Sequence, residues 1–407
     1  MTSLESTPRP VAAAALPAAF DGLLDRIEGS LEKWAAGRGW WWKLAALCSL
    51  CSIFYAAPNF TLLWPKEPPL LWSVVDRQTS NLLTPVTDVD STTHESKRVF
   101  RLTPPALAKL SPVANWKGRM LFLFALQYTA GIVFFALCGR LLNAMLHSPA
   151  AATLLTLSFA FIYPGQAFFW DVTGWFDGLA IFLLVLTLVV RSAPLIFACL
   201  FAAFWVDERA IVASSFSFLW LKLRERPDAT ARDLLCPDLR SAMVPLAIGV
   251  TLLLRTYLAR THGFLLPISA EAGVGLAPFF KDDRLFRLPL GILSPFKAHW
   301  ALFVLAGASA WLNRQWALLL LGSAAVAAST LAAVAVADVT RSLAYAFPGV
   351  LVAVGTIARH AGARFMVELS AIVLLLAIVL PSYNVMSGVN WMFPLPLKML
   401  QSPLLWR

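Results

Sequence analysis

The sequence predicts an all-α fold, a polytopic membrane protein of about eleven transmembrane helices with a long first extracytoplasmic loop. Hydrophobic residues make up 59% of the 407 residues and charged residues only 14%, whereas soluble globular chains carry roughly 25% charged residues. Apolar stretches of about 18–22 residues recur, the length needed to cross a bilayer. Many of the 16 tryptophans stand at the ends of these stretches, as interfacial aromatic belts require.

Residues 1–39 are expected to form a cytoplasmic tail that carries an amphipathic helix on the membrane surface. Charged residues separate its apolar residues, which recur at helical spacing. The pattern favours anchoring over catalysis. The apolar positions are Phe20, Leu23, Leu24, Ile27, Leu31 and Trp34.

Residues 40–392 are predicted to form the multi-span transmembrane domain, followed by a Pro-rich tail at residues 393–407. Pro164 and Gly165 are expected to break the third span. The fourth to sixth spans are short for a bilayer core, so they must tilt or thin the membrane locally. The predicted spans cover approximately residues 44–64, 120–141, 150–167, 179–190, 193–206, 210–223, 243–258, 299–312, 316–336, 343–358 and 365–380.

The loop at residues 222–240 fixes the expected orientation, because it is the most basic short loop and is therefore cytoplasmic. Counting spans from it places the N-terminus inside, with Arg140, Arg191, Arg314 and residues 359–364. The opposite side receives the long loops 65–118 and 259–298 and the turns at 171–177, 207–209 and 338–341. The turns on this second side carry acidic residues, whereas the short turns on the cytoplasmic side carry almost none. The acidic turns predict an extracytoplasmic cavity lined by carboxylates and arginines.

The chemistry of such a cavity suits group transfer from a lipid phosphate on the outer leaflet. Carboxylates can act as general bases or bind sugar hydroxyls, and interfacial arginines can neutralise a phosphate leaving group. The candidate catalytic residues are Asp88, Asp90 and Asp171. The candidate substrate-binding residues are His94, Asp177, Asp207, Glu208, Arg209 and Arg341.

The first-loop candidates also have simpler interpretations. Asp88 and Asp90 could be turn formers, and His94 could be a solvated loop residue. No cofactor is certain. A divalent cation, Mg²⁺ or Mn²⁺, could bind the oxygen ligands of Asp88 and Asp90.

The remaining candidates have structural alternatives too. Asp171 and Asp177 could cap the following helix. Residues 207–209 could form a solvated hairpin with a local ion pair, and Arg341 could pair with Asp338 one helical turn away.

Asp88-Val89-Asp90 follows the first predicted span, and Trp170-Asp171 with Asp177 follows the third. In span count and acid placement, residues 40–380 resemble the GT-C class of integral membrane glycosyltransferases. Those enzymes use polyprenyl-phosphate-linked sugars and carry acidic motifs in these two places. The resemblance implies a lipid-linked sugar donor and a glycan, lipid or protein acceptor. It also implies a multi-pass protein, with a bacterial inner (plasma) membrane as the expected location.

Two other functions remain open on the sequence. An O-antigen-type polymerase or ligase would use arginine and histidine in a large outer loop, for which residues 65–118 or 259–298 could serve. A lipid or solute transporter would favour charges in the middle of spans and two related halves. Nucleic-acid binding is not expected, because the basic residues behind the net charge of +10 are scattered over many loops. They suit contact with anionic membrane lipids instead.

Overall fold

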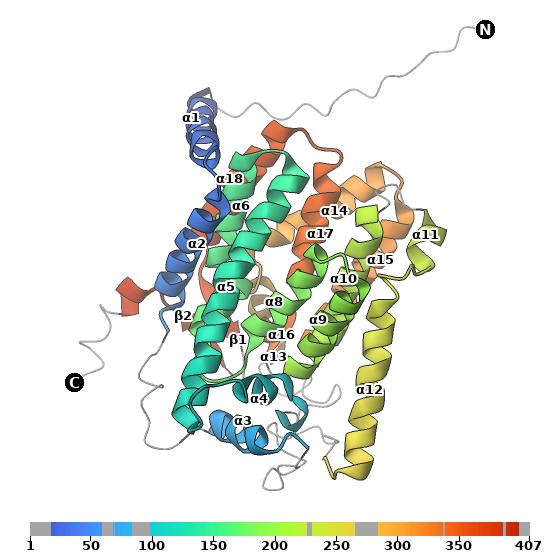
Figure 1. The fold of residues 1–407 in the computed structure, drawn as a ribbon. Helices are drawn as coiled ribbons and strands as arrows, with labels where there is room; N and C mark the ends of the chain where they lie inside the picture. The colour runs from blue at the N-terminus through green and yellow to red at the C-terminus, as the bar shows by residue number, and fades with distance from the viewer. Residues whose placement is uncertain are drawn as a thin grey trace.

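The computed structural model describes residues 18–58, 68, 70–83, 98–225, 230–264, 284–336, 338–385 and 388–398. Within these residues the chain is mostly helical, and the helices form an elongated bundle (Figure 1). The first half contributes α1 (Ala18–Ala35), α2 (Trp40–Ala56), α3 (Leu70–Ser80), α4 (Thr103–Ala108), α5 (Trp116–Leu146), α6 (Pro149–Ser158), η3 (Phe159–Phe161), α7 (Tyr163–Trp170), α8 (Asp177–Val189) and α9 (Ala193–Val206).

The second half completes the bundle and adds a small sheet that an all-α prediction does not include. Strands β1 and β2 form an antiparallel hairpin in which Ser382 pairs with Met392 and Val385 with Val389. The elements are α10 (Arg209–Glu225), α11 (Ala231–Leu235), α12 (Met243–Thr261), α13 (Arg284–Leu293), η5 (Lys297–His299), α14 (Trp300–Leu312), α15 (Trp316–Val334), α16 (Val339–Ala344), α17 (Phe347–Ala358), α18 (Ala363–Val379), β1 (Ser382–Val385) and β2 (Val389–Met392).

Several helices could cross a membrane. Among the described residues, α5, α12 and α15 are each long and apolar enough to span a bilayer. Two bent helix pairs raise the number of candidate spans to as many as 5. The apolar helices α8, α9 and α17 are shorter.

The first bent pair corresponds to the break expected at Pro164 and Gly165. Helices α6 and α7 meet at 56°, and Ile162 between them has an extended backbone. Pro164 lies in the first turn of α7, where a missing N–H costs no hydrogen bond. At Gly165 a Cβ atom would lie 2.0 Å from the carbonyl oxygen of Phe159, so only glycine fits beside the break.

Both long loops contain helices. The 65–118 segment includes α3 and α4, and α4 begins at Thr103 with Pro104 and Pro105 in its first turn. The second part of the 259–298 segment, predicted to be a loop, forms α13, which meets the helix that follows at 84°. The apolar residues Phe286, Leu290 and Leu293 of α13 are exposed, as in a helix that lies at a membrane surface.

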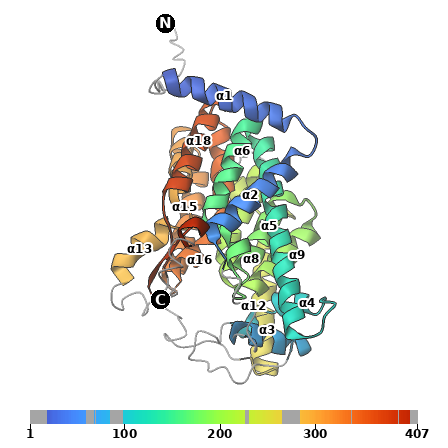
Figure 2. The same cartoon turned by 90° about the vertical axis from the view of Figure 1, so that its left-hand side faces the viewer.

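The two ends of the bundle carry different turns. In both views α1 lies across one end, and α3 and α4 lie at the other (Figures 1 and 2). Contacts join the turns predicted to be cytoplasmic: Arg359 donates to the carbonyl of Leu223 at 3.2 Å, and Arg224 donates to that of Leu188 at 3.1 Å. The segments around residues 188, 224 and 359, which the sequence assigns to one side, thus lie close together.

The helix α1 packs part of its apolar side against the rest of the protein. Leu24 is 2% exposed, and Ile27, Leu31 and Trp34 pack against the main hydrophobic core. Arg364 at the start of α18 forms ion pairs with Asp25 and Glu28. The apolar side of α1 thus closes one end of the bundle.

A cluster of phenylalanines joins α5, α7 and α17 in the middle of the bundle. The ring of Phe134 lies 4.9 Å from that of Phe168 and 5.2 Å from that of Phe347. All three side chains are fully buried. Such close packing transmits small changes in shape, so the cluster fixes the direction of α7 and of the loop that leaves it.

Candidate functional site

The turn between α9 and α10 is built around the buried carboxylate of Asp207. Its Oδ1 accepts hydrogen bonds from the backbone N–H and the Nε–H of Arg209, at 3.0 and 2.7 Å. Its Oδ2 accepts a third from Nη2–H at 2.6 Å. Asp207 is 0% exposed, so this turn is a packed ionic structure and not the solvated hairpin that the sequence leaves open.

Arg101, which precedes α4, joins this turn from the first long loop. Its Nη2 lies 2.7 Å from Oδ2 of Asp207 and 3.4 Å from Oε1 of Glu208. Burial alone would raise the pKa of Asp207, but the guanidinium groups of Arg101 and Arg209 outweigh it and lower that pKa. The same balance, again led by burial opposed by Arg101, lowers the pKa of Glu208. Both acids are therefore carboxylates at neutral pH.

Asp177, the first residue of α8, occupies the centre of the network. Its carboxylate accepts two hydrogen bonds from Arg341, from Nε at 2.6 Å and Nη2 at 2.9 Å. The hydroxyls of Tyr163 and Tyr345 donate to it at 2.9 and 2.8 Å, and Nη2 of Arg209 approaches at 3.4 Å. A bidentate arginine pair of this kind fixes orientation as well as charge.

The position of Asp177 depends on its neighbour in the chain. A Cβ atom on Gly178 would lie 2.9 Å from the Cα of Phe168, so glycine lets α8 approach the backbone of α7. That approach brings Asp177 within hydrogen-bonding distance of Tyr163, at the start of α7.

Arg341 connects Asp177 to a further acid. Its Nη1 donates to Oδ2 of Asp338 at 2.7 Å, the pair that the sequence spacing suggests. The guanidinium also lies 3.6 Å from the ring centroid of Trp175, which stabilises a cation held out of water. Arg341 is 4% exposed, so its charge is compensated almost entirely by the protein.

Asp171 shapes the loop between α7 and α8. Its Oδ1 accepts hydrogen bonds from both the N–H and the hydroxyl of Thr173, and from the N–H groups of Gly174 and Trp175. Its Oδ2 accepts one from the N–H of Phe176 at 2.5 Å. Because five donors surround this buried carboxylate, Asp171 stabilises the loop. This role is close to the helix cap that the sequence offers as an alternative to catalysis. The loop that Asp171 holds presents Trp175 to Arg341.

A small hollow lies beside this network. Four arginines, two acids and one valine line it: Arg98, Arg101, Arg209, Arg341, Glu208, Asp338 and Val336. Within the described part of the chain, Oδ1 of Asp338 and Nε of Arg101 are buried without a hydrogen-bond partner. Because buried polar atoms are normally paired, the hollow offers a free acceptor and a free donor to a ligand.

Asp338 differs from Glu208, the other acid of the hollow. Burial raises its pKa, although Arg341 and Arg209 act in the opposite direction. A carboxylate with a raised pKa binds a proton more readily, as a general base must. Asp338 thus combines an unpaired oxygen with suitable basicity.

Arg255 ties the long helix α12 to the same region. Its Nη2 lies 3.8 Å from Oε2 of Glu208, and its guanidinium lies 5.4 Å from the ring of Phe100 and 5.8 Å from that of Trp205. An arginine inside a candidate membrane span is costly unless it faces protein or water. Here it faces the charged network.

The structure brings together five of the predicted substrate-binding residues, and it places Asp171 in the adjoining loop. Asp88, Asp90 and His94 lie outside the described residues. In the described segments no group of three or more metal-ligating side chains occurs. The residues brought together are Asp177, Asp207, Glu208, Arg209 and Arg341.

Sequence reasoning did not single out several members of the network. Arg255 had a usable signal, because it interrupts an apolar stretch. Asp338 was noticed only as a partner of Arg341. Tyr163 and Tyr345 carry no signal in the sequence, since buried tyrosines are common in helical cores.

Neither protein-family models, nor curated proteins, nor solved structures include a match to this chain.

Proposed function

We propose that this protein is a membrane glycosyltransferase that moves a sugar from a polyprenyl-phosphate-linked donor to a glycan, lipid or protein acceptor on the extracytoplasmic face. The observation that carries the proposal is the hollow where Arg98, Arg101, Arg209 and Arg341 meet Glu208 and Asp338. Guanidinium groups recognise phosphate by geometry as well as charge. A carboxylate in the same hollow supplies the base.

The reaction requires one bond to form and one to break. The acceptor hydroxyl attacks the anomeric carbon of the sugar while the bond from that carbon to the phosphate oxygen breaks. The hydroxyl proton passes to a carboxylate, for which Asp338 is our preferred candidate beside the first-loop acids Asp88 and Asp90. The electron pair remains on the phosphate oxygen, where the arginines stabilise the added charge.

The buried acids have a supporting part in this scheme. Asp177 and Asp207 hold Arg341 and Arg209 in place, so the cations need no rearrangement when phosphate binds. Leaving either arginine unpaired in this buried setting would be costly. The two acids therefore act as positioning residues.

The proposal includes eleven spans in a bacterial inner membrane, with the hollow on the outer side and a role in cell-envelope glycan synthesis. Helices α8, α9 and α17 would then cross a locally thinned bilayer or tilt within it. Cysteines introduced at positions 90 and 208 should react from outside intact cells with a membrane-impermeant maleimide. The exposed native Cys236 should react only after permeabilisation, and the reverse pattern would exclude this topology.

The direct test is transfer by the purified protein in lipid vesicles. The vesicles receive a panel of polyprenyl-phosphate sugars and glycan acceptors, and release of free polyprenyl phosphate is measured. Asp88→Asn and Asp90→Asn are compared with the unmodified protein. Full activity in both variants would remove the first loop from the mechanism, and absence of release with every donor would reject the proposal.

Two observations favour other functions, which can be tested in the same vesicles. Helix pairs bent by 56° and 84° resemble the broken helices of transporters, so the same vesicles are assayed for movement of intact polyprenyl phosphate between leaflets. Four arginines in one hollow also suit an O-antigen-type polymerase or ligase. That activity would release lipid carrier only from a donor that bears a preassembled glycan.

A further inference from the structure

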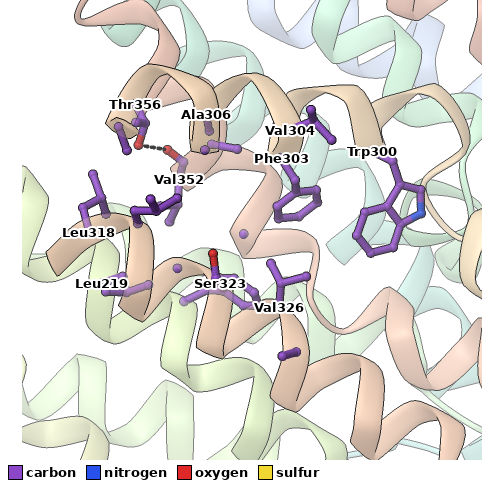
Figure 3. Close-up of a pocket in the computed structure, with 18 residues that line it drawn as sticks. Leu219, Trp300, Phe303, Val304, Ala306, Leu318, Ser323, Val326, Val352 and Thr356 are labelled. Carbon is purple, nitrogen blue, oxygen red and sulfur yellow. Dashed lines mark hydrogen bonds between the residues drawn. The ribbon is translucent and has the colours of Figure 1, made fainter. Parts of the chain in front are cut away.

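An apolar groove runs along one side of the bundle between α10, α14, α15 and α17. Its cavity volume is about 360 Å³, within the range of small-molecule binding sites. Side chains from all four helices point into it (Figure 3). They include Leu219, Phe303, Val304, Leu318, Val326 and Val352.

The groove offers almost no hydrogen bonding. Ser323 and Thr356 are its hydroxyl residues, and the hydroxyl of Thr356 donates to the carbonyl oxygen of Val352 in its own helix at 2.9 Å, as Figure 3 shows. Val304 is 70% exposed, so the groove opens toward the surroundings of the bundle. A ligand here must be apolar and enter from the membrane.

Small residues keep the groove open. Gly322 of α15 lines it, and a Cβ atom at that position would meet nothing within 4 Å. The opposite wall is tight, because a Cβ atom on Gly349 would lie 2.7 Å from the ring of Phe216. The free space therefore lies on the α15 side.

The groove leads toward the arginine hollow. A second small hollow, lined by Arg209, Ser329, Ser342 and Tyr345 among others, lies farther along α10 and α15 than the apolar groove. It shares Arg209 with the charged hollow. From Leu318 in the groove to Ala333 in this second hollow, α15 extends about 22 Å at 1.5 Å per residue.

We propose that this groove holds the hydrocarbon chain of a lipid whose phosphate binds the arginine hollow, so that the two sites form one lipid-phosphate site along α15. The inference rests on the proposed function only for the identity of the lipid, a polyprenyl phosphate. Membrane lipid tails are as apolar as the groove. The groove therefore sets the path of the chain, and the arginines supply most of the selectivity.

The test uses a polyprenyl phosphate that carries a photoactivatable diazirine near the far end of its chain. It is incorporated into vesicles with the purified full-length protein, and the crosslinked peptides are mapped by mass spectrometry. We expect crosslinks concentrated on α14 and α15 around Val304 and Ser323. Leu253 of α12 is as exposed as Val304, at 73% against 70%. Crosslinks to Leu253 as strong as those to α14 and α15 would overturn the proposal.

A matched pair of variants tests whether the free space beside Gly322 is needed for lipid binding. Gly322→Leu should reduce crosslinking to α14 and α15 at least tenfold. Gly249→Leu on α12, where a Cβ atom also meets nothing within 4 Å, should leave it unchanged. Equal effects of the two changes would overturn the proposal, as would a second copy of the chain crosslinked across the groove.

The groove and the enzyme activity can fail separately. A groove that binds the probe in a protein that transfers no sugar supports the lipid-phosphate site and rejects the glycosyltransferase. Transfer that Gly322→Leu leaves unchanged, with crosslinks elsewhere, rejects the groove and keeps the enzyme. A diazirine-bearing phosphatidylethanolamine that labels α14 and α15 as strongly as polyprenyl phosphate would reject the stated ligand.

Discussion

Arg341 holds the carboxylate of Asp177 with two hydrogen bonds, at 2.6 and 2.9 Å, across 164 residues of sequence. Both side chains are almost completely buried. Each is therefore the main compensation for the charge of the other. The five predictions below depend on this pair and on the residues that surround it.

Asp177→Asn should destabilise the protein by about 3–5 kcal/mol, because it removes a buried charge and leaves Arg341 undercompensated. Thermal unfolding in detergent measures the change. Asp25→Asn on α1 is the control, since Asp25 is 66% exposed and surface ion pairs contribute about 0–1 kcal/mol. Equal stability of the two variants would contradict the central position given to Asp177.

Asp338→Asn should reduce the rate of sugar transfer about 10²–10⁴-fold, the usual contribution of a general base. Arg341 keeps its two bonds to Asp177 in this variant, so stability should fall less than in Asp177→Asn. Turnover and thermal unfolding are measured on the same preparation. A fully active Asp338→Asn would assign the base to the first loop.

Arg101→Gln should weaken use of the lipid donor about 10–100-fold, since hydrogen bonds to charged groups contribute about 1.5–3 kcal/mol. The change should appear mainly in the KM for the donor, and the KM for the acceptor should be unaffected. Arg119→Gln, which breaks the partly buried pair of Arg119 with Asp76 away from the hollow, is the matched control. Parallel losses for donor and acceptor would indicate that Arg101 maintains the fold.

The pH dependence of stability should follow the lowered pKa of Asp207. A depressed pKa in the folded state adds stability above the unfolded value of about 3.9, and that stability is lost as pH falls toward the folded value. Thermal stability of the unmodified protein should therefore be constant from about pH 8 to 5, as far as Asp207 contributes, and decline below about pH 4. The Asp207→Asn variant should lose less thermal stability than the unmodified protein when the pH is lowered.

Activity should decline on acidification before stability does. The pKa of Asp338 is raised by burial, so this base becomes protonated at a higher pH than an ordinary aspartate, above about 3.9. A pH profile of turnover should show an acid limb that lies above the pH of unfolding. If turnover and folded protein were lost over the same pH range, acidification would act on activity only through unfolding.

The sequence determined the class of protein and the position of its polar residues along the chain. Its apolar content indicated a helical membrane protein, and helices that could cross a bilayer agree with that prediction. The acidic turns could be assigned to one side by counting predicted spans from the basic 222–240 loop. In the structure, ion pairs of Asp177 with Arg209 and Arg341 join three of these turns.

Only the tertiary structure decided which charges meet. Arg101 reaches Glu208 across 107 residues, and local periodicity contains no information on such a pair. The phenylalanine packing around Phe168 and the close approach at Gly178 set the position of Asp177. For the same reason Asp171 became a loop-shaping residue and Asp338 a candidate base: burial and neighbouring charge, which depend on the whole fold, set the chemistry of a carboxylate.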